Sequence, residues 1–276
     1  MIVISIASKE PHVPNPYAIL NRIRLEVGAF GMADASGNDT NSQATHKDAM
    51  VQRYLRRQSL WYRLLRPPLP LIANPHESSL PPVKEGPKLF VGGAGQATQP
   101  GFLNLDLVYF PGVDLVADIE CLPFRDDSIV AIECDAVLEH VRRPSNAIFE
   151  FARVLRPGGF LHVVVPFCHP FHEYPRDYQR WTIDGLRELL SEFEIIDIGL
   201  RTGPTTTLLS FMLEYAKMIS PRPFRKVAYG VSCWLLWPLR YLDVWLMQRP
   251  EATIMGNHVY ALLRKPIPDE RHAHDC

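Results

Sequence analysis

The chain has 276 residues, and 47% of them are hydrophobic, which is enough to form a sizeable core in one or two domains. The formal net charge is −1, so the composition does not indicate a nucleic-acid partner. The five cysteines are scattered without a Cys-x-x-Cys pair, which favours a reducing compartment over a disulfide framework or zinc ribbon. The apolar start MIVISIA has no basic segment before it and does not indicate a signal peptide, so we expect a cytoplasmic protein.

The first third of the chain has a weak structural pattern. Residues 1–45 are rich in Pro, Gly, Asn and Ser, which predicts a disordered segment. Apolar residues at helical spacing predict a helix from His46 to Leu65, and prolines end it, so we interpret 46–86 as a helix followed by a Pro-rich linker. The arginines between Arg53 and Arg66 indicate a solvated helix face rather than a nucleic-acid-binding patch.

From residue 87 onward the chain alternates strand and helix patterns. This alternation predicts a mostly parallel sheet that is covered on both faces. We predict strands at 88–92, 102–106, 113–117, 129–134, 159–165, 193–199 and 257–263, and helices at 144–155 and 182–191. Pro144 suits the first turn of its helix, and Thr182 suits the cap of the second. Pro157-Gly158-Gly159 is predicted to separate the first helix from the strand that follows.

Four short motifs stand in order between Lys88 and Pro166: the glycines of FVGGAG, then LPF, LEHV and LRPGG. This order resembles a class I S-adenosylmethionine (SAM)-dependent methyltransferase of the methyltransferase type 11 kind, which acts on small molecules and is found beside glycan-assembly enzymes. The resemblance covers residues 87–203. It implies a methyltransferase domain over 87–265 with a Rossmann-like sheet, an antiparallel last strand, and a helical insertion at 205–255 before that strand. Residues 266–276 are then a tail.

The resemblance also implies SAM as the cofactor, held where the first three strands end. The glycine turn lets backbone N–H groups approach the methionine carboxylate of SAM. Asp106 is placed to accept hydrogen bonds from both ribose hydroxyls, and Asp118 ends the strand from which the family contacts adenine. The predicted cofactor-binding residues are Gly92, Gly93, Gly95, Asp106, Asp118 and Ile119.

Several residues depart from the family pattern. Phe90 and Val91 replace an acidic residue before the glycines, and Val130 replaces an aspartate. Only Gln96–Gly101 separates the glycine turn from the next strand, whereas a crossover that includes a helix needs at least about 10 residues, so a tight loop is expected there. These departures support an alternative function, a non-catalytic methyltransferase-like binding or scaffolding module.

The segment 166–182, PFCHPFHEYPRDYQRWT, concentrates polar and aromatic residues at the end of a buried strand. It resembles the HPxHxYPxDxxR loop of methyltransferases found beside glycan and natural-product enzymes, and a surface loop held by packing is the alternative. Methyl transfer requires positioning of the acceptor and, for a hydroxyl or amine, removal of its proton. We predict a general base at His169 or His172 and substrate-orienting residues at Arg180 or Tyr174. The predicted catalytic residues are His140, His169, His172, Tyr174 and Arg180.

Two other chemistries fit the sequence less well. A dinucleotide fingerprint needs a third glycine where Thr98 stands, and an acid later than Asp106. The run from Cys168 through His169 to His172 lacks a fourth ligand at metal spacing, so we predict no metal.

The apolar segment 205–250 contains an uncharged run of 13 residues, Val227–Leu239, against the about 20 needed to span a bilayer. We therefore expect helices that cover the acceptor side of the crevice or lie on a membrane surface.

The predicted function is SAM-dependent methylation of a small hydroxylated acceptor, such as a sugar, a lipid-linked glycan or a natural product. Peripheral membrane contact through 205–250 is expected, and a nucleic-acid partner is not.

Overall fold

The computed structural model describes residues 71–83, 86–93, 101–173 and 176–268. The predicted disordered segment 1–45 and the predicted helix at 46–65 lie outside these residues, as do Gly95 and the connection 94–100. The tight loop expected before the second strand therefore stays a prediction.

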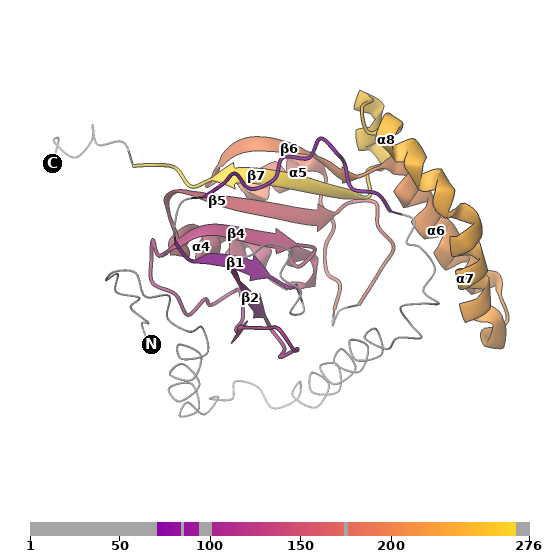
Figure 1. The fold of residues 1–276 in the computed structure, drawn as a ribbon, viewed down its shortest axis with the longest axis horizontal. Coiled ribbons are helices and arrows are strands. Elements are labelled where there is room, and N and C mark those ends of the chain that lie inside the picture. The colour runs from indigo at the N-terminus through magenta and orange to yellow at the C-terminus, as the bar shows by residue number, and fades with distance from the viewer. Residues whose placement is uncertain (1–70, 84–85, 94–100, 174–175, 269–276) are drawn as a thin grey trace.

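Seven strands form a single sheet in the order β3-β2-β1-β4-β5-β7-β6 (Figure 1). The strands are β1 (Lys88–Val91), β2 (Phe102–Asp106), β3 (Leu115–Val116), β4 (Ile129–Asp135), β5 (Leu155–Pro166), β6 (Glu194–Thr202) and β7 (His258–Arg264). The pairs β1–β2, β1–β4, β2–β3 and β4–β5 are parallel, whereas β7 runs antiparallel between β5 and β6. The mostly parallel sheet and its antiparallel last strand are thus confirmed.

The LRPGG motif lies inside a strand, which corrects the prediction that it separates a helix from the strand. β5 begins at Leu155, directly after the helix ends at Val154. Gly158 has a φ of +75°, which suits glycine, and the pairing register between β4 and β5 shifts between Ile129 and Ala131. The motif therefore bends the start of β5 while its backbone stays in the sheet.

Two helices pack on one face of the sheet, α4 (Pro144–Val154) and α5 (Ile183–Leu189), which lie behind it in Figure 1. Pro144 is the first residue of α4, and the Thr182 side chain accepts a hydrogen bond from Gly185 N (3.1 Å) at the start of α5, as predicted. The buried side chains include Ala147, Ile148 and Phe151 of α4 and Leu161, Val163 and Val165 of β5, which share one hydrophobic cluster. Alternate residues of β5 therefore point toward these helices.

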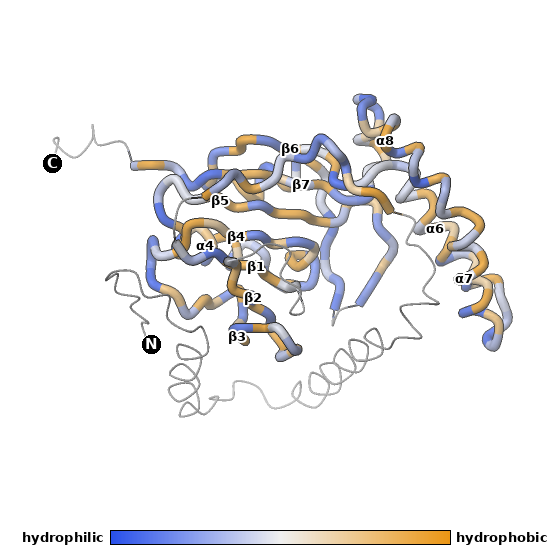
Figure 2. The backbone as a smooth tube through the Cα atoms, in the orientation of Figure 1, coloured by the Kyte–Doolittle hydropathy of each residue, from blue (hydrophilic) through white to orange (hydrophobic). Residues whose placement is uncertain are grey.

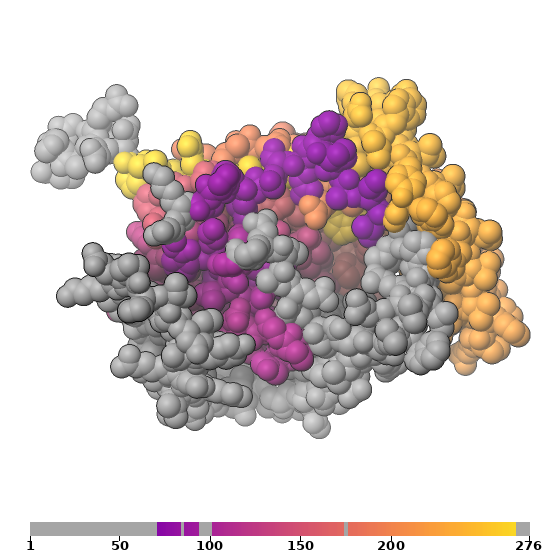
Figure 3. All heavy atoms as spheres, in the orientation of Figure 1, coloured from indigo at the N-terminus to yellow at the C-terminus, as the bar shows by residue number. Residues whose placement is uncertain are grey.

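The opposite face of the sheet is crossed by residues 71–83, which lie in front of β5, β6 and β7 (Figures 1 and 3). Asn74 N donates to Arg201 O (2.8 Å) beside an isolated bridge between Ala73 and Thr202. Glu77 is buried and lies 3.2 Å from His162 Nε2 on β5, and it also pairs with the Arg201 guanidinium. This Pro-rich segment therefore covers the sheet through buried polar contacts.

A helical insertion stands between β6 and β7, at the edge where the parallel strands end (Figure 1). It contains α6 (Pro204–Ile219), η2 (Arg222–Phe224), α7 (Arg225–Leu236), η3 (Trp237–Tyr241), α8 (Leu242–Leu246) and η4 (Pro250–Met255). Within the described part of the chain, no helix combines the length and apolar character needed to cross a membrane. The predicted helical insertion before the final strand is confirmed.

A fully buried aspartate on α8 joins α8 to the start of α6. The Asp243 carboxylate accepts hydrogen bonds from Thr205 N (2.7 Å), Thr206 N (2.8 Å) and Thr206 Oγ1 (2.7 Å) at the start of α6. A Cβ atom at Gly203 would lie only 2.5 Å from the Asp243 carboxyl carbon. Asp243 therefore satisfies the free N–H groups of the α6 N-terminus and fixes where this helix leaves β6.

We expect Asp243→Ala to lower the free energy of unfolding by about 2–4 kcal/mol, because two buried backbone N–H groups lose their acceptor. Urea denaturation of the full chain measures this change. Asp184→Ala is the matched control, because its carboxylate is 92% exposed and its loss should change stability by less than about 0.5 kcal/mol. Equal stability of the two variants would contradict the proposed anchoring role of Asp243.

Candidate active site

The glycine turn after β1 packs directly against the loop after β4. Gly92 has a φ of +78°, and its N–H donates to Leu105 O (2.9 Å) at the end of β2. A Cβ atom at this position would lie 2.1 Å from Val137 Cγ2, so the close approach requires glycine. Parallel strands bind ligands beyond their carboxyl ends, and the turn lies at that edge of the sheet.

Asp106 is the last residue of β2, as predicted, whereas Asp118 lies two residues beyond the end of β3 rather than at its end. Asp106 is 9% exposed, and Oδ1 accepts a hydrogen bond from the backbone N–H two residues along the chain (3.2 Å). Ala117 N donates to Asp106 O (3.0 Å), which brings the residues after β3 beside the end of β2. Asp118 is exposed and caps its own turn, whereas Ile119 is buried. These positions are compatible with the predicted cofactor contacts, which stay predictions.

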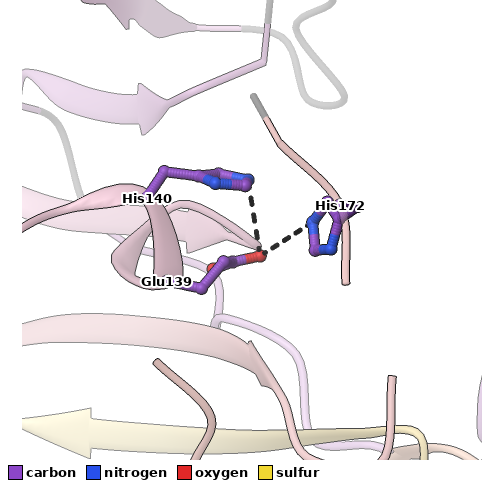
Figure 4. Close-up of side chains that lie close together, drawn as sticks. All are labelled: Glu139, His140 and His172. Carbon is purple, nitrogen blue, oxygen red and sulfur yellow. Dashed lines mark ion pairs between the residues drawn. The ribbon is translucent and has the colours of Figure 1, made fainter. Parts of the chain in front are cut away.

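A buried carboxylate lies at the centre of the histidine cluster. Glu139 belongs to η1 (Leu138–His140), and its side chain is 0% exposed. Glu139 Oε1 lies 3.8 Å from His140 Nε2 and 3.6 Å from His172 Nε2 (Figure 4). Neither carboxylate oxygen of Glu139 accepts a hydrogen bond from a residue that the structure describes. Two imidazole nitrogens therefore face one buried carboxylate oxygen.

The loop 166–182 is attached to η1 through its backbone. Tyr178 N donates to Glu139 O (2.8 Å), and His140 Nδ1 lies 2.5 Å from Arg176 O. Because a carbonyl oxygen only accepts hydrogen bonds, His140 donates from Nδ1 and directs Nε2 toward Glu139. These two contacts place His172, on the loop, beside the LEHV motif.

Asp177 and Arg180 hold the shape of this loop. Asp177 Oδ2 accepts hydrogen bonds from Arg180 Nη2 (2.6 Å) and His172 N (2.8 Å), and Arg180 Nε donates to His169 O (3.3 Å). Burial raises the pKa of the Asp177 carboxyl, but these hydrogen bonds outweigh burial and hold its pKa at about 2. Arg180 therefore orders the loop, and its predicted contact with substrate stays a prediction.

Four histidines gather at the carboxyl edge. The ring of His172 lies 4.9 Å from that of His140 and 4.7 Å from that of His169, whose ring lies 5.0 Å from that of His258. Burial lowers the pKa of His140 and of His169, and it lowers the pKa of His258 to about 3. For His172, burial also lowers the pKa, but Glu139 outweighs burial and raises it. The histidines therefore differ in their ability to carry a proton at neutral pH.

A pocket of about 320 Å³ opens beside this cluster. It is lined by His169, Phe171, Asp177, Tyr178, Gln179 and Arg180. Its volume lies at the lower end of the range for small-molecule sites, about 300–1,000 Å³.

The structure brings together three of the predicted catalytic residues, His140, His169 and His172, with Arg180 alongside. Tyr174 lies outside the described residues. Three members of the cluster were not predicted, namely Glu139, Asp177 and His258. Glu139 and Asp177 lie inside the motifs that drew attention to their neighbours, but nothing in the sequence pairs His258 at the start of β7 with the loop.

Residues 98–163 match the family described as methyltransferase domain. A demethylmenaquinone methyltransferase from Renibacterium salmoninarum is 43% identical over 71 residues, which is 25% of this chain and 30% of that protein. An uncharacterized chloroplastic methyltransferase from Arabidopsis thaliana is 35% identical over 94 residues, 32% of this chain and 26% of that protein. The chain thus spans about a quarter to a third of the length of these curated relatives.

Solved structures are similar over more of the chain. A 1,6-didemethyltoxoflavin-N1-methyltransferase from Burkholderia thailandensis, in a complex with 1,6-didemethyltoxoflavin and S-adenosylhomocysteine, is 14% identical with a TM-score of 0.44. That match covers 85% of this chain and 94% of the other. A protein from Galdieria sulphuraria that is described as a sarcosine dimethylglycine methyltransferase is 12% identical with a TM-score of 0.43. That match covers 90% of this chain and 98% of the other.

Proposed function

We propose that this chain, whose residues 98–163 match the methyltransferase domain family, is a class I SAM-dependent methyltransferase that transfers a methyl group from SAM to a hydroxyl group of a small acceptor. Sugars, lipid-linked glycans and hydroxylated natural products are the proposed acceptor classes. The observation that best supports this function is the closeness of the glycine turn to the histidine cluster. The glycine turn after β1 touches Val137, and two residues later Glu139 meets the histidines of the loop 166–182.

The residues at the edge of the sheet fit SAM. Gly92 leaves room for close backbone contact, since a Cβ atom at that position would collide with Val137. Asp106 presents a buried carboxylate at the end of β2, where ribose hydroxyls would find an acceptor. When SAM is bound, it supplies an electrophilic methyl group on a sulfonium with a good leaving group. The chain then needs to position the acceptor and remove its proton.

His169 is the stronger candidate for the general base. Its Nδ1 lies 2.8 Å from Pro170 O, which accepts a hydrogen bond from Nδ1–H, so Nε2 carries the lone pair that can take a proton. His169 also lines the pocket beside the cluster. His172 Nε2 faces the Glu139 carboxylate instead, which makes His172 a weaker candidate for the general base than His169.

We also propose that the hairpin of α6 and α7 rests on a membrane surface that contains anionic lipid. Apolar residues mark both helices in Figure 2, and exposed examples are Leu208, Phe211, Tyr215, Met218, Ile219, Val227, Val231, Trp234 and Leu235. Arg222 and Phe224 of η2 are exposed between the two helices, and Arg225 and Lys226 are exposed at the start of α7. Apolar and aromatic side chains beside clustered basic residues are typical of helices that lie in the lipid interface. A lipid-linked acceptor would be presented at such a surface.

We expect Asp106→Ala to weaken SAM binding by about 10- to 100-fold, because the ribose hydroxyls lose a hydrogen-bond acceptor worth about 1–3 kcal/mol. Calorimetric titration of SAM measures the effect, with Asp184→Ala as the exposed control. Unchanged affinity in Asp106→Ala would remove this residue from the cofactor site. Lack of SAM binding by the unmodified chain would instead favour the non-catalytic binding or scaffolding module.

We expect His169→Ala to slow methyl transfer by about 10²- to 10⁴-fold while SAM affinity is retained, because a general base contributes about that factor. The assay is single-turnover transfer of labelled methyl from SAM to a panel of sugars, lipid-linked glycans and phenols. His172→Ala is measured in parallel, and the exposed His76→Ala is the control. Near wild-type rates in both loop variants would show that the loop only shapes the pocket.

We expect the double variant Trp234→Ser, Leu235→Ser to lower binding to phosphatidylglycerol-containing vesicles by at least about tenfold, because two apolar side chains leave the lipid. Vesicle flotation measures the bound fraction, and pure phosphatidylcholine vesicles should bind less because they lack the anionic charge. Val116→Ser, at an exposed position of β3, is the control. Equal flotation of both variants, or retention in membranes after carbonate washing, would contradict peripheral contact through the hairpin.

A further inference from the structure

We propose that Glu139, His140 and His172 bind a divalent transition-metal ion, and that this ion holds the oxygen atom of the methyl acceptor. The role of the ion toward the acceptor rests on the proposed function. Binding of the ion does not depend on it, because the site is defined by three side chains of this chain alone (Figure 4).

The first reason is the buried carboxylate. The Glu139 side chain is 0% exposed, and both of its oxygens lack a hydrogen bond from the described residues. A buried carboxylate without hydrogen bonds is costly, and such groups are normally paired or coordinate a metal. The only cationic partners within 4.0 Å among the described residues are the two imidazoles, and their nitrogens lie at 3.6 and 3.8 Å, beyond hydrogen-bonding distance.

The second reason is the orientation of the two imidazoles. His140 donates from Nδ1 to Arg176 O (2.5 Å), so a neutral ring presents a lone pair at Nε2 toward Glu139. His172 Nδ1 faces two acceptors, Pro170 O at 3.4 Å and Asp177 Oδ2 at 3.6 Å, and its Nε2 also points to Glu139. One ligand atom from each of the three side chains then faces the same point, where a cation would be held between them.

The third reason is the spacing of the ligand atoms. One atom each from Glu139, His140 and His172 lie within 4.8 Å of one another. Bonds of about 2.0–2.2 Å around a tetrahedral ion place ligand atoms about 3.3–3.5 Å apart. The two observed separations from Glu139 Oε1, 3.6 and 3.8 Å, need to shorten by only a few tenths of an ångström.

The surroundings of the three ligands fit a metal site as well. Metal-binding histidines usually donate their second N–H to a backbone carbonyl or carboxylate, as His140 does to Arg176 O and as His172 Nδ1 can do to Pro170 O at 3.4 Å. Imidazole ligands favour Zn²⁺, Co²⁺, Fe²⁺ or Ni²⁺ over Mg²⁺ and Ca²⁺. Three protein ligands leave a fourth position open, as in catalytic rather than structural sites.

The open position gives the ion a role in methyl transfer. A cation held there would make an acceptor hydroxyl at the open position more acidic. His169 Nε2 would take the hydroxyl proton as the oxygen forms its bond to the methyl carbon of SAM. The bond between that carbon and sulfur would break, and its electron pair would stay on sulfur, which would leave as a neutral thioether. The acceptor class that fits this site is therefore an alcohol or phenol rather than an amine.

The test is a calorimetric titration of Zn²⁺ into the full-length chain, repeated with Co²⁺ by visible absorption. Since the last five residues include His272, His274 and Cys276, all proteins carry His272→Ala, His274→Ala and Cys276→Ser to remove competing ligands. We expect one ion per chain. Glu139→Gln and His172→Ala should each weaken binding at least about tenfold, and His76→Ala, at an exposed histidine, should leave it unchanged.

Thermal unfolding guards against variants that fail to fold. Saturating Zn²⁺ should raise the melting temperature of the background protein, because the ion binds the folded state, and should raise that of Glu139→Gln much less. Absence of saturable binding, or one-to-one binding that survives in both Glu139→Gln and His172→Ala, would overturn the proposal. Glu139 and His172 would then form an ion pair without a metal.

Failure of the metal site can be distinguished from failure of the proposed function. If SAM binds and methyl transfer proceeds at full rate after chelation with EDTA, the metal role is wrong while the methyltransferase function stands. If Zn²⁺ binds as predicted but SAM does not, the site stands and the proposed function fails. The two titrations are independent because their ligands are held by different residues.

Discussion

The site depends on the attachment of the loop 166–182 to the turn after β4. Two hydrogen bonds link these segments, one from Tyr178 N to Glu139 O at 2.8 Å and one from the His140 side chain, Nδ1, to Arg176 O at 2.5 Å. They bring the histidines of the loop beside the LEHV motif. Because Val137 of the same turn packs against Gly92, the attachment also sets the distance between the loop and the glycine turn. One short segment thus links the proposed cofactor and acceptor sides.

Burial of Glu139 gives this region its chemical character. A buried carboxylate that lacks hydrogen bonds from the described residues reduces stability, and a bound cation would offset that cost. A second polar cluster, formed by Glu77, His162 and Arg201 under residues 71–83, differs because Glu77 pairs directly with the Arg201 guanidinium. Its Glu77 Oε1 and His162 Nε2 also lack a hydrogen bond from the described residues, so that cluster is satisfied only in part. The two clusters therefore differ in the partner of the carboxylate, a guanidinium for Glu77 and two imidazoles for Glu139.

The sequence predicted the sheet well and the site only in part. Strand positions follow from short apolar runs, and their alternation with helices predicts parallel pairing, as β1–β2 and β4–β5 show. LRPGG was placed wrongly because Pro and Gly normally end elements, whereas here they bend a strand that stays paired. Glu139 and His172 are 33 residues apart, and their contact depends on how a loop folds back, which periodicity does not encode. The roles of Gly95 and Tyr174 stay predictions.

We propose that the glycine turn and the cluster of Glu139, His140 and His172 form the two halves of one methyl-transfer site. A crystal structure of the full chain grown with S-adenosylhomocysteine and Zn²⁺ tests this arrangement most directly. We expect the ribose beside Asp106, the sulfur atom directed toward the loop 166–182, and metal density between Glu139 and the two histidines. S-adenosylhomocysteine bound away from Gly92, or with its sulfur turned from the histidines, would contradict this arrangement.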